Sequence, residues 1–363
     1  MAMTSRERIE AALGHMEPDR TPLFEYVLLS PVADGLLGRT HAADPANWTS
    51  LVQEKGWEGT VRQTAVDRLD LACLLGHDMM YVTPNPPPLV QADTGTPSAG
   101  EQGGDPVARL RERNDMVKRA AACPAEESFL VYVFLREEMH RRGVDLPILA
   151  PAYVHGVWTD VDLMQAMLLE PEVAHEHFTL ATRRALAMIG KYASLGIDQI
   201  GVGGDFAGNV LLISPQAYRE FVVPEVRTLS RAIHAAGCRA VNASDGNLWP
   251  VIDDFLLGCE VDGYLEIDMY AGMDLRRLKA RYGDRVTLYG NLDCGTMLSF
   301  GTPEEIRRHT LDCLEAGLGN GGHILCASNA ITASVPLENY LAIVQAYRDV
   351  FGLPPLPIGK GSK

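Results

Sequence analysis

The sequence predicts a single α/β domain with the (β/α)8 barrel (TIM barrel) fold, and three observations support this fold class. Eight short apolar runs of strand type alternate with segments of helical periodicity along the 363 residues. Polar residues follow the ends of these runs, as they do at the mouth of a barrel. A doubly wound dinucleotide-binding sheet would show a Gly-x-Gly-x-x-Gly turn after its first strand, and the chain has no such turn.

The first quarter of the chain has a helix, a proline-rich turn and a strand, followed by a helical region and a second strand. Residues 1–20 are expected to be a helical extension that precedes the barrel. Pro84 ends the second strand. The elements expected before Pro84 are helix 5–13, strand 23–29, helical segments 47–57 and 68–75, and strand 79–83.

Residues 84–104 are rich in proline and glycine and show little periodicity, so we expect a long loop there. A loop of this length inside a compact domain is usually functional, and a loop after a barrel strand emerges on the catalytic face. The sequence therefore predicts a lid at residues 84–104.

From residue 124 onward, helices and strands alternate regularly, and each helix begins at a recognisable signal. Thr302-Pro303-Glu304-Glu305, for example, supplies a capping hydroxyl, a proline in the first turn and two carboxylates. The expected strands are residues 146–151, 199–203, 239–242, 263–267, 286–289 and 323–326. The expected helices are residues 124–143, 160–169, 171–195, 215–236, 249–257, 274–282, one from 302, and 336–351.

Composition excludes several classes of protein. The net charge is −15, from 47 acidic and 32 basic side chains, without a basic block, so nucleic acid and anionic membranes are disfavoured partners. No apolar run approaches the roughly 18 residues of a membrane helix, and no signal-peptide pattern opens the chain, which favours a cytoplasmic location. The seven cysteines are scattered without a Cys-x-x-Cys pair, so we expect reduced thiols.

Acidic and amide side chains recur at the ends of the expected strands. Such residues also cap helices and form turns, which is the alternative explanation for any one of them. Several at one rim would raise the pKa of at least one carboxyl and supply a general acid. We therefore expect Asp78, Asp205, Asp245 and Glu266 to surround one pocket. The full set at the strand ends is Glu25, Asp78, Asp205, Asn242, Asp245, Glu266, Asn291, Asp293, Cys326 and Asn329.

Several short segments together resemble the uroporphyrinogen decarboxylase superfamily, which also contains zinc-dependent methyltransferases of corrinoid metabolism. They occur in the order of that superfamily and span nearly the whole chain, and they imply the same barrel fold. The segments are 4–22, Gly76-His-Asp-Met-Met-Tyr-Val-Thr-Pro84, Gly204-Asp-Phe-Ala-Gly208, 213–224, Asp245-Gly-Asn247, Tyr289-Gly-Asn-Leu-Asp293 and Ser328-Asn-Ala-Ile331.

The resemblance implies catalytic roles for two aspartates. Asp78 stands where the decarboxylases keep the aspartate that contacts the pyrrole nitrogens, and Asp205 resembles the aspartate of the fourth-strand motif. An anion suits this task because cationic charge develops on the ring. The decarboxylases also hold their substrate with arginines after the first strand, whereas this chain has Glu25 and no arginine before Arg39. Uroporphyrinogen itself is therefore disfavoured as the substrate.

The methyltransferase branch binds zinc through His-x-Cys after strand five and a cysteine after strand eight. The corresponding positions here are Ala243, Asp245 and Asn329. These residues lack thiolate and imidazole ligands, so we expect no tight zinc site and no cofactor. Cys294 and Cys326 could form a rearranged site, but free cysteines more often pack as small apolar residues.

Three further residues are candidates near the third strand. His155 could act as an acid or base at neutral pH, and Tyr153 with Trp158 could form an aromatic wall for a flat substrate. Packing in the core is the alternative for each.

The leading prediction is a decarboxylase-like lyase for a small molecule other than uroporphyrinogen, with Asp78 and Asp205 as catalytic residues. The predicted substrate-binding residues are Glu25, Tyr153, His155, Asn242, Asp245, Glu266, Asn291, Asp293 and Asn329. One alternative is a methyltransferase that works with a corrinoid protein, and another is a non-catalytic ligand-binding barrel. The resemblance also implies a homodimer.

Overall fold

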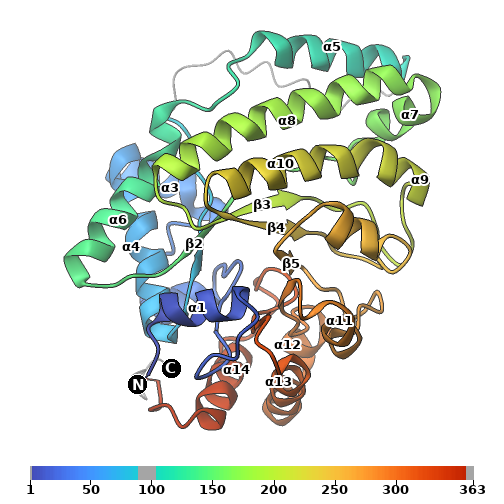
Figure 1. The fold of residues 1–363 in the computed structure, drawn as a ribbon. Helices are drawn as coiled ribbons and strands as arrows, with labels where there is room; N and C mark the ends of the chain where they lie inside the picture. Colours follow the sequence, from blue (N-terminus) through green and yellow to red (C-terminus); the bar gives the residue numbers. More distant parts are fainter. Residues whose placement is uncertain (1, 89–103, 357–363) are drawn as a thin grey trace.

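Seven parallel strands form the central sheet in the computed structural model, which describes residues 2–88 and 104–356 (Figure 1). The strand order follows the chain from β1 to β7, and every neighbouring pair is parallel. The strands are β1 Met80–Tyr81, β2 Ile148–Pro151, β3 Gln199–Gly203, β4 Arg239–Ala243, β5 Gly263–Leu265, β6 Thr287–Tyr289 and β7 His323–Ile324. The alternation of strands and helices therefore gives the expected parallel α/β architecture.

The strand predicted at residues 23–29 does not form as a regular strand. Leu23 lies between the two edges of the sheet, since its carbonyl accepts a hydrogen bond from Asp78 N–H at 2.7 Å and it forms a parallel bridge with Leu325. Its own N–H donates to the Asp78 carboxylate at 3.0 Å, and Pro22 has no N–H, so this segment supplies few ladder hydrogen bonds. The described residues thus form a curled sheet of seven strands whose edges are joined through Leu23.

Helices surround the outer face of this curled sheet, whose inner face is filled by apolar side chains. In Figure 1, α8 and α10 lie over β3 and β4 with α5 beyond them, and α13 and α14 lie on the opposite side. The helices are α1 Ser5–Leu13, α2 Val32–Leu37, η1 Pro45–Asn47, α3 Trp48–Lys55, α4 Trp57–Leu75, α5 Pro106–Arg119, η2 Glu126–Phe129, α6 Leu130–Arg142, α7 Val161–Leu169, α8 Pro171–Ser194, α9 Pro215–Ala217, η3 Tyr218–Val222, α10 Val223–Ala235, η4 Asp254–Gly258, α11 Leu275–Tyr282, α12 Thr296–Phe300, α13 Pro303–Gly317 and α14 Leu337–Val350.

Three helical predictions need correction. The helix α5 was not predicted, although Asp105 caps it through a hydrogen bond from Val107 N–H at 3.0 Å and Pro106 opens it. The single helix predicted at residues 215–236 divides into α9, the wider turn η3 and α10, which begins beside Pro224. The helix predicted at 249–257 is reduced to η4, a short turn at Asp254–Gly258.

The helix α1 closes the amino-terminal end of the curled sheet. Its residues Ile9, Ala12 and Leu13 pack against the apolar side chains that fill the inside of the sheet, among them Phe24 and Tyr289. The carbonyl of Ala12 accepts hydrogen bonds from Thr287 Oγ1 and from Gly322 N–H. The carboxyl-terminal ends of the strands, where barrel enzymes bind their ligands, lie at the opposite end.

Two further features concern membranes and the expected lid. No helix within residues 2–88 and 104–356 is both long and apolar enough to cross a bilayer. Most of the lid predicted at residues 84–104 lies outside the described residues, so the lid stays a prediction.

Candidate active site

Three carboxyl groups meet at the carboxyl-terminal end of neighbouring strands. Asp205 and Asp245 each follow the last residue of their strand, β3 or β4, by two positions, and Glu266 follows β5 directly. One ligand oxygen from each lies within 4.8 Å of the other two. The turn before Asp205 requires glycine, because a Cβ on Gly203 would lie 2.2 Å from Asn242 Oδ1. Of the four side chains expected around one pocket, Asp205, Asp245 and Glu266 thus meet here.

Burial and mutual repulsion keep protons on two of these groups. Burial, with the charges of the nearby Asp245 and Asp205 second, raises the pKa of Glu266 to about 8. Burial, with the charge of Asp205 second, raises the pKa of Asp245 to about 7. Asn329 Nδ2 donates to Asp245 Oδ2 at 2.6 Å, and Asp245 N–H donates to Asp205 Oδ1 at 2.8 Å. At neutral pH Glu266 therefore holds a proton that it can donate.

The backbone of Glu266 is unusual for a residue with a side chain. Its φ angle is +70°, in the left-handed region that favours glycine. Such a conformation costs on the order of 1–3 kcal/mol and is found preferentially at functional sites. The fold thus holds this carboxyl in place against a local conformational preference.

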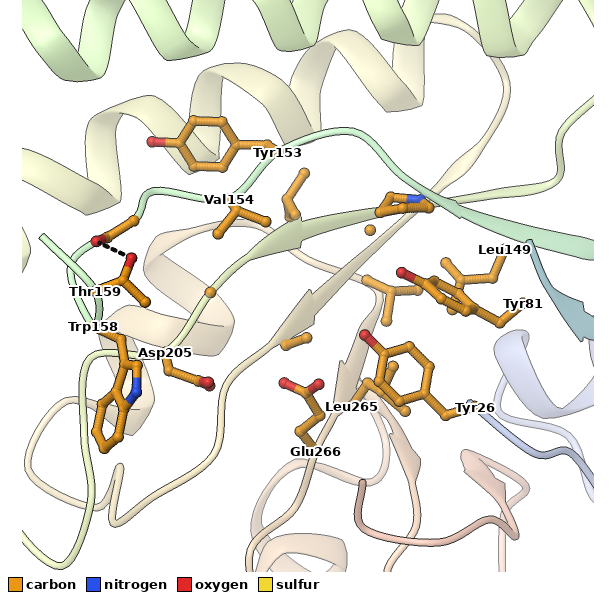
Figure 2. A pocket seen from close by; sticks show the side chains of 17 residues that line it. Tyr26, Tyr81, Leu149, Tyr153, Val154, Trp158, Thr159, Asp205, Leu265 and Glu266 are labelled. Atoms are coloured by element: carbon orange, nitrogen blue, oxygen red, sulfur yellow. Dashed lines mark hydrogen bonds between the residues drawn. The ribbon is translucent and has the colours of Figure 1, made fainter. Parts of the chain in front are cut away.

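A cavity of about 250 Å³ lies in front of these groups and is lined mainly by apolar side chains. Figure 2 shows Tyr26 and Tyr81 on one side of it, Glu266 and Asp205 facing into it, and Trp158 at its far edge. The two tyrosine rings are 4.5 Å apart, and the Tyr26 hydroxyl contacts both Tyr81 and Glu266. This arrangement suits a small flat molecule held between aromatic rings and carboxyl groups.

A second, more open hollow of about 410 Å³ continues outward from the first, and the two share Trp158 and Asp205. Asp245, Asp293 and Asn329 line it. No lysine or arginine of the described chain lines either hollow. The site therefore offers no guanidinium for a substrate with many carboxylates, as the sequence around Glu25 indicated.

Asp78 does not belong to this site, and its predicted place beside Asp205 is wrong. It precedes β1, so it lies at the amino-terminal end of the sheet, the end opposite Asp205. There its fully buried carboxylate accepts hydrogen bonds from Arg8 at 2.6 Å, from Arg20 at 2.8 Å and from Ser5 Oγ at 2.9 Å. Through its contacts with Arg8 and Ser5, Asp78 holds α1 against the sheet, which is a structural role.

Two predicted amides also point away from the cavity. Along β4 the side chains of Val241 and Ala243 face the cavity, so the intervening Asn242 faces the helices, where its Nδ2 donates to Phe255 O at 3.1 Å. Asn291 is likewise buried outside the cavity, with Nδ2 donating to Met273 O. Their predicted contact with substrate is therefore not supported by their position.

The two candidates after β2 are placed differently from expectation. The ring of Tyr153 points toward the helices in Figure 2, and its hydroxyl lies near Thr182 and Glu225. His155 is buried against Phe206, where burial lowers its pKa to about 4, so it stays uncharged at neutral pH. His155 does not line the cavity and is no acid or base for it, whereas Tyr153 and Trp158 both belong to its lining, as the expected aromatic wall requires.

Asp293 lies at the rim of the outer hollow and holds a turn. Its carboxylate accepts hydrogen bonds from the N–H groups of Gly295, Thr296 and Met297 and from the Tyr270 hydroxyl. This is the capping role that was the alternative for every polar strand-end residue.

The sequence reasoning missed Tyr26 and Tyr81. Tyr81 could have been predicted from the alternation of side chains along the strand. Met79 faces inward, and Tyr81 is two residues further on, so it faces the same way. Glu25, in contrast, is buried behind the tyrosines, where burial raises its pKa to about 8.

The donor atoms at the mouth do not fit a thiolate-rich zinc site. Among the described residues, the cluster of potential metal ligands found is the oxygen set of Asp205, Asp245 and Glu266. Cys326 is buried inside the sheet, and Cys294 Sγ contacts Ser328 Oγ at 3.4 Å. Oxygen donors of this kind suit a hard cation such as Mg²⁺ rather than zinc.

Comparison with known proteins gives one family and two kinds of relative. The model of the uroporphyrinogen decarboxylase (URO-D) family matches residues 147–350. A uroporphyrinogen decarboxylase of Coxiella burnetii is 24% identical over 263 residues, which is 67% of this chain and 70% of the relative. A methylated-thiol–coenzyme M methyltransferase of Methanosarcina mazei is 26% identical over 208 residues, which is 56% of this chain and 51% of the relative.

A solved methyltransferase structure has the same fold. A methyltransferase from Methanosarcina mazei superimposes with a TM-score of 0.67 at 18% identity, and the match covers 96% of this chain and 99% of the other. At this identity the likeness concerns the fold alone.

Proposed function

The chain belongs to the uroporphyrinogen decarboxylase family, and on this premise we propose that it is a carboxy-lyase for a small, flat, electron-rich acid. Glu266 is the proposed proton donor, and Asp205 the proposed anion that stabilises the protonated substrate. The observation that carries the proposal is a carboxyl group that keeps its proton at neutral pH, because of the raised pKa of Glu266, and faces a narrow aromatic cavity.

The proposed reaction has two steps. Glu266 first transfers its proton to the ring carbon that bears the carboxylate, and the ring becomes cationic. The bond between that carbon and the carboxylate then breaks, CO2 leaves, and the bonding electron pair restores the ring. The anionic Asp205 lowers the barrier by stabilising the cationic intermediate in a cavity with little water. Solvent returns the proton to Glu266, with Asp245 as the neighbouring group of suitable pKa.

Methyl transfer is a second candidate, which a specific observation favours. The absence of lysine and arginine from the lining of both hollows, among the described residues, suits a neutral or cationic methylated compound better than an acid. Glu266 would then protonate the heteroatom that loses its methyl group. A corrinoid protein is the predicted partner under this alternative, and a homodimer stays a prediction under both.

Incubation with small aromatic and heteroaromatic carboxylic acids in D2O tests the carboxy-lyase. We expect CO2 release together with one deuterium at the carbon that carried the carboxylate, because the proton of Glu266 exchanges with solvent before it is transferred. Proton NMR of the product locates the deuterium. Methyl loss from O-methylated or N-methylated compounds without CO2 release would instead establish the second candidate, and binding without turnover of any substrate would favour a ligand-binding barrel.

A further inference from the structure

A small cavity of about 40 Å³ lies behind Tyr26 and Tyr81, on the side away from the three carboxyl groups. Tyr26 and Tyr81 line both this cavity and the larger one. The other polar residues around it are Glu25, His41, Arg68 and His77. None of the residues of the proposed reaction, Asp205, Asp245 and Glu266, lines it.

Three nitrogen atoms at this cavity are buried and have no hydrogen-bond partner among the described residues. They are Arg68 Nε, His41 Nδ1 and His77 Nε2. The histidine side chains are almost completely buried, at 2% exposure for His41 and 8% for His77. The carboxylate of Asp67 is 3.7 Å from His41 Nδ1, too far for a hydrogen bond. Unsatisfied buried nitrogens are rare, so three at one cavity indicate an absent partner.

The charge balance of the cavity is positive. Arg68 donates from Nη1 to Tyr81 O at 2.8 Å, and no carboxylate of the described chain lies within ion-pair distance of its guanidinium. Burial raises the pKa of Glu25 to about 8, so its carboxyl is neutral at pH 7. Burial also lowers the pKa of His77 to about 3, so this ring is uncharged. A largely buried guanidinium without a counter-ion is costly, and an anion would relieve that cost.

We propose that this cavity binds a carboxylate group of the substrate through Arg68 Nε and His77 Nε2. The volume admits a carboxylate or a halide, since on the same measure roughly 10–15 Å³ already holds one water molecule. A flat acid lying against Tyr26 and Tyr81 can extend one carboxylate into this cavity while a second lies on the side of Glu266. The identity of the ligand rests on the proposed function, and the affinity for an anion does not.

The anion site restricts the class of substrate. The substrate is a flat acid with at least two carboxylates on different sides of its ring, of which one is anchored at Arg68 and the other is lost as CO2. The site also explains why no lysine or arginine of the described residues lines the two hollows at the mouth. The cation that recognises the acid is Arg68, which lies behind the tyrosines.

Crystals soaked in sodium bromide test the anion site directly. We expect an anomalous bromide peak beside Arg68 Nε in the native protein and in Arg62→Met, but not in Arg68→Met. Arg62 is the matched control, because it lies on the same helix α4 and its side chain is half exposed. Arg68→Lys keeps the charge but lacks Nε, so it should show a weaker peak. Circular dichroism would check that Arg68→Met and Arg68→Lys fold like the native protein. A native protein without the peak, or a peak that survives in Arg68→Met, would overturn the site.

A second measurement separates a substrate carboxylate from a free inorganic anion. By titration calorimetry, isophthalate should bind the native protein about 10- to 100-fold more tightly than benzoate, as expected for one charge-assisted hydrogen-bonded pair. This preference should vanish in Arg68→Met and persist in Arg62→Met. Bromide binding without the preference would overturn the substrate anchor. Both results without CO2 release from any acid would overturn the carboxy-lyase and leave the anion site standing.

Discussion

Replacing Glu266 with glutamine is expected to lower kcat by about 10²- to 10⁴-fold, the usual contribution of a positioned general acid. Glutamine keeps the size and the hydrogen-bonding shape of the side chain but cannot donate a proton to carbon. The native kcat/KM should be high below the pKa of Glu266, about 8, and fall as the pH rises through that value, because the donor loses its proton. Steady-state kinetics from pH 5 to pH 10 on the acid that releases CO2 would measure both effects.

Glu260→Gln is the matched control for this experiment. Glu260 shares the left-handed backbone conformation, with φ of +56°, but its side chain pairs with Arg231 on the surface. Its substitution should leave both kcat and the pH profile unchanged. A Glu266→Gln enzyme with native turnover and the same fall in activity above pH 8 would show that another group donates the proton.

Replacing Asp78 with alanine is expected to lower the free energy of unfolding by about 3–5 kcal/mol and to leave kcat within about twofold. The change removes the partner of two guanidinium groups, those of Arg8 and Arg20, which have side-chain exposures of 5% and 16%. The loss is large because each arginine then remains buried without this counter-ion. Urea denaturation would measure the stability, and kcat would be referred to the folded fraction.

Asp145→Ala provides the comparison for Asp78. Asp145 also pairs with an arginine of α1, Arg6, but its side chain is 62% exposed, so solvent screens the pair and the expected loss is at most about 1 kcal/mol. If Asp78→Ala instead abolished turnover with little change in stability, Asp78 would be the catalytic residue that the sequence resemblance implies.

The difference between Asp78 and Asp205 shows what the sequence could predict. The alternation of strands and helices places Asp205, Asp245 and Glu266 after their strands, and parallel strands bring such positions together. Asp78 precedes its strand, which the sequence already placed at residues 79–83, so its assignment to the catalytic end came from the resemblance and not from the strand boundary. The helix α1 then brings Arg8 to Asp78 from the other end of the sheet, a contact between residues 70 positions apart.

Side-chain direction was a second limit of the sequence reasoning. Asn242 lies in the same strand as Val241, which faces the cavity, and a shift of one residue in a strand reverses the face. The strands are short here, so the sequence does not determine which residues of a strand face the cavity. The pKa values were also beyond prediction, because they depend on how deeply Glu266 and Glu25 are buried.

Infrared difference spectroscopy on the protein labelled with ¹³C at the glutamate carboxyl groups tests the central claim most directly. The native protein should contain glutamic acid side chains that remain protonated at pH 7 and titrate near pH 8, one of them Glu266 and another Glu25. In Glu266→Gln one of these signals should be missing and the other kept. Ordinary glutamates titrate below about pH 6. If the Glu266→Gln spectrum differed from the native spectrum only in that range, Glu266 would be ionised at neutral pH and could not be the proton donor.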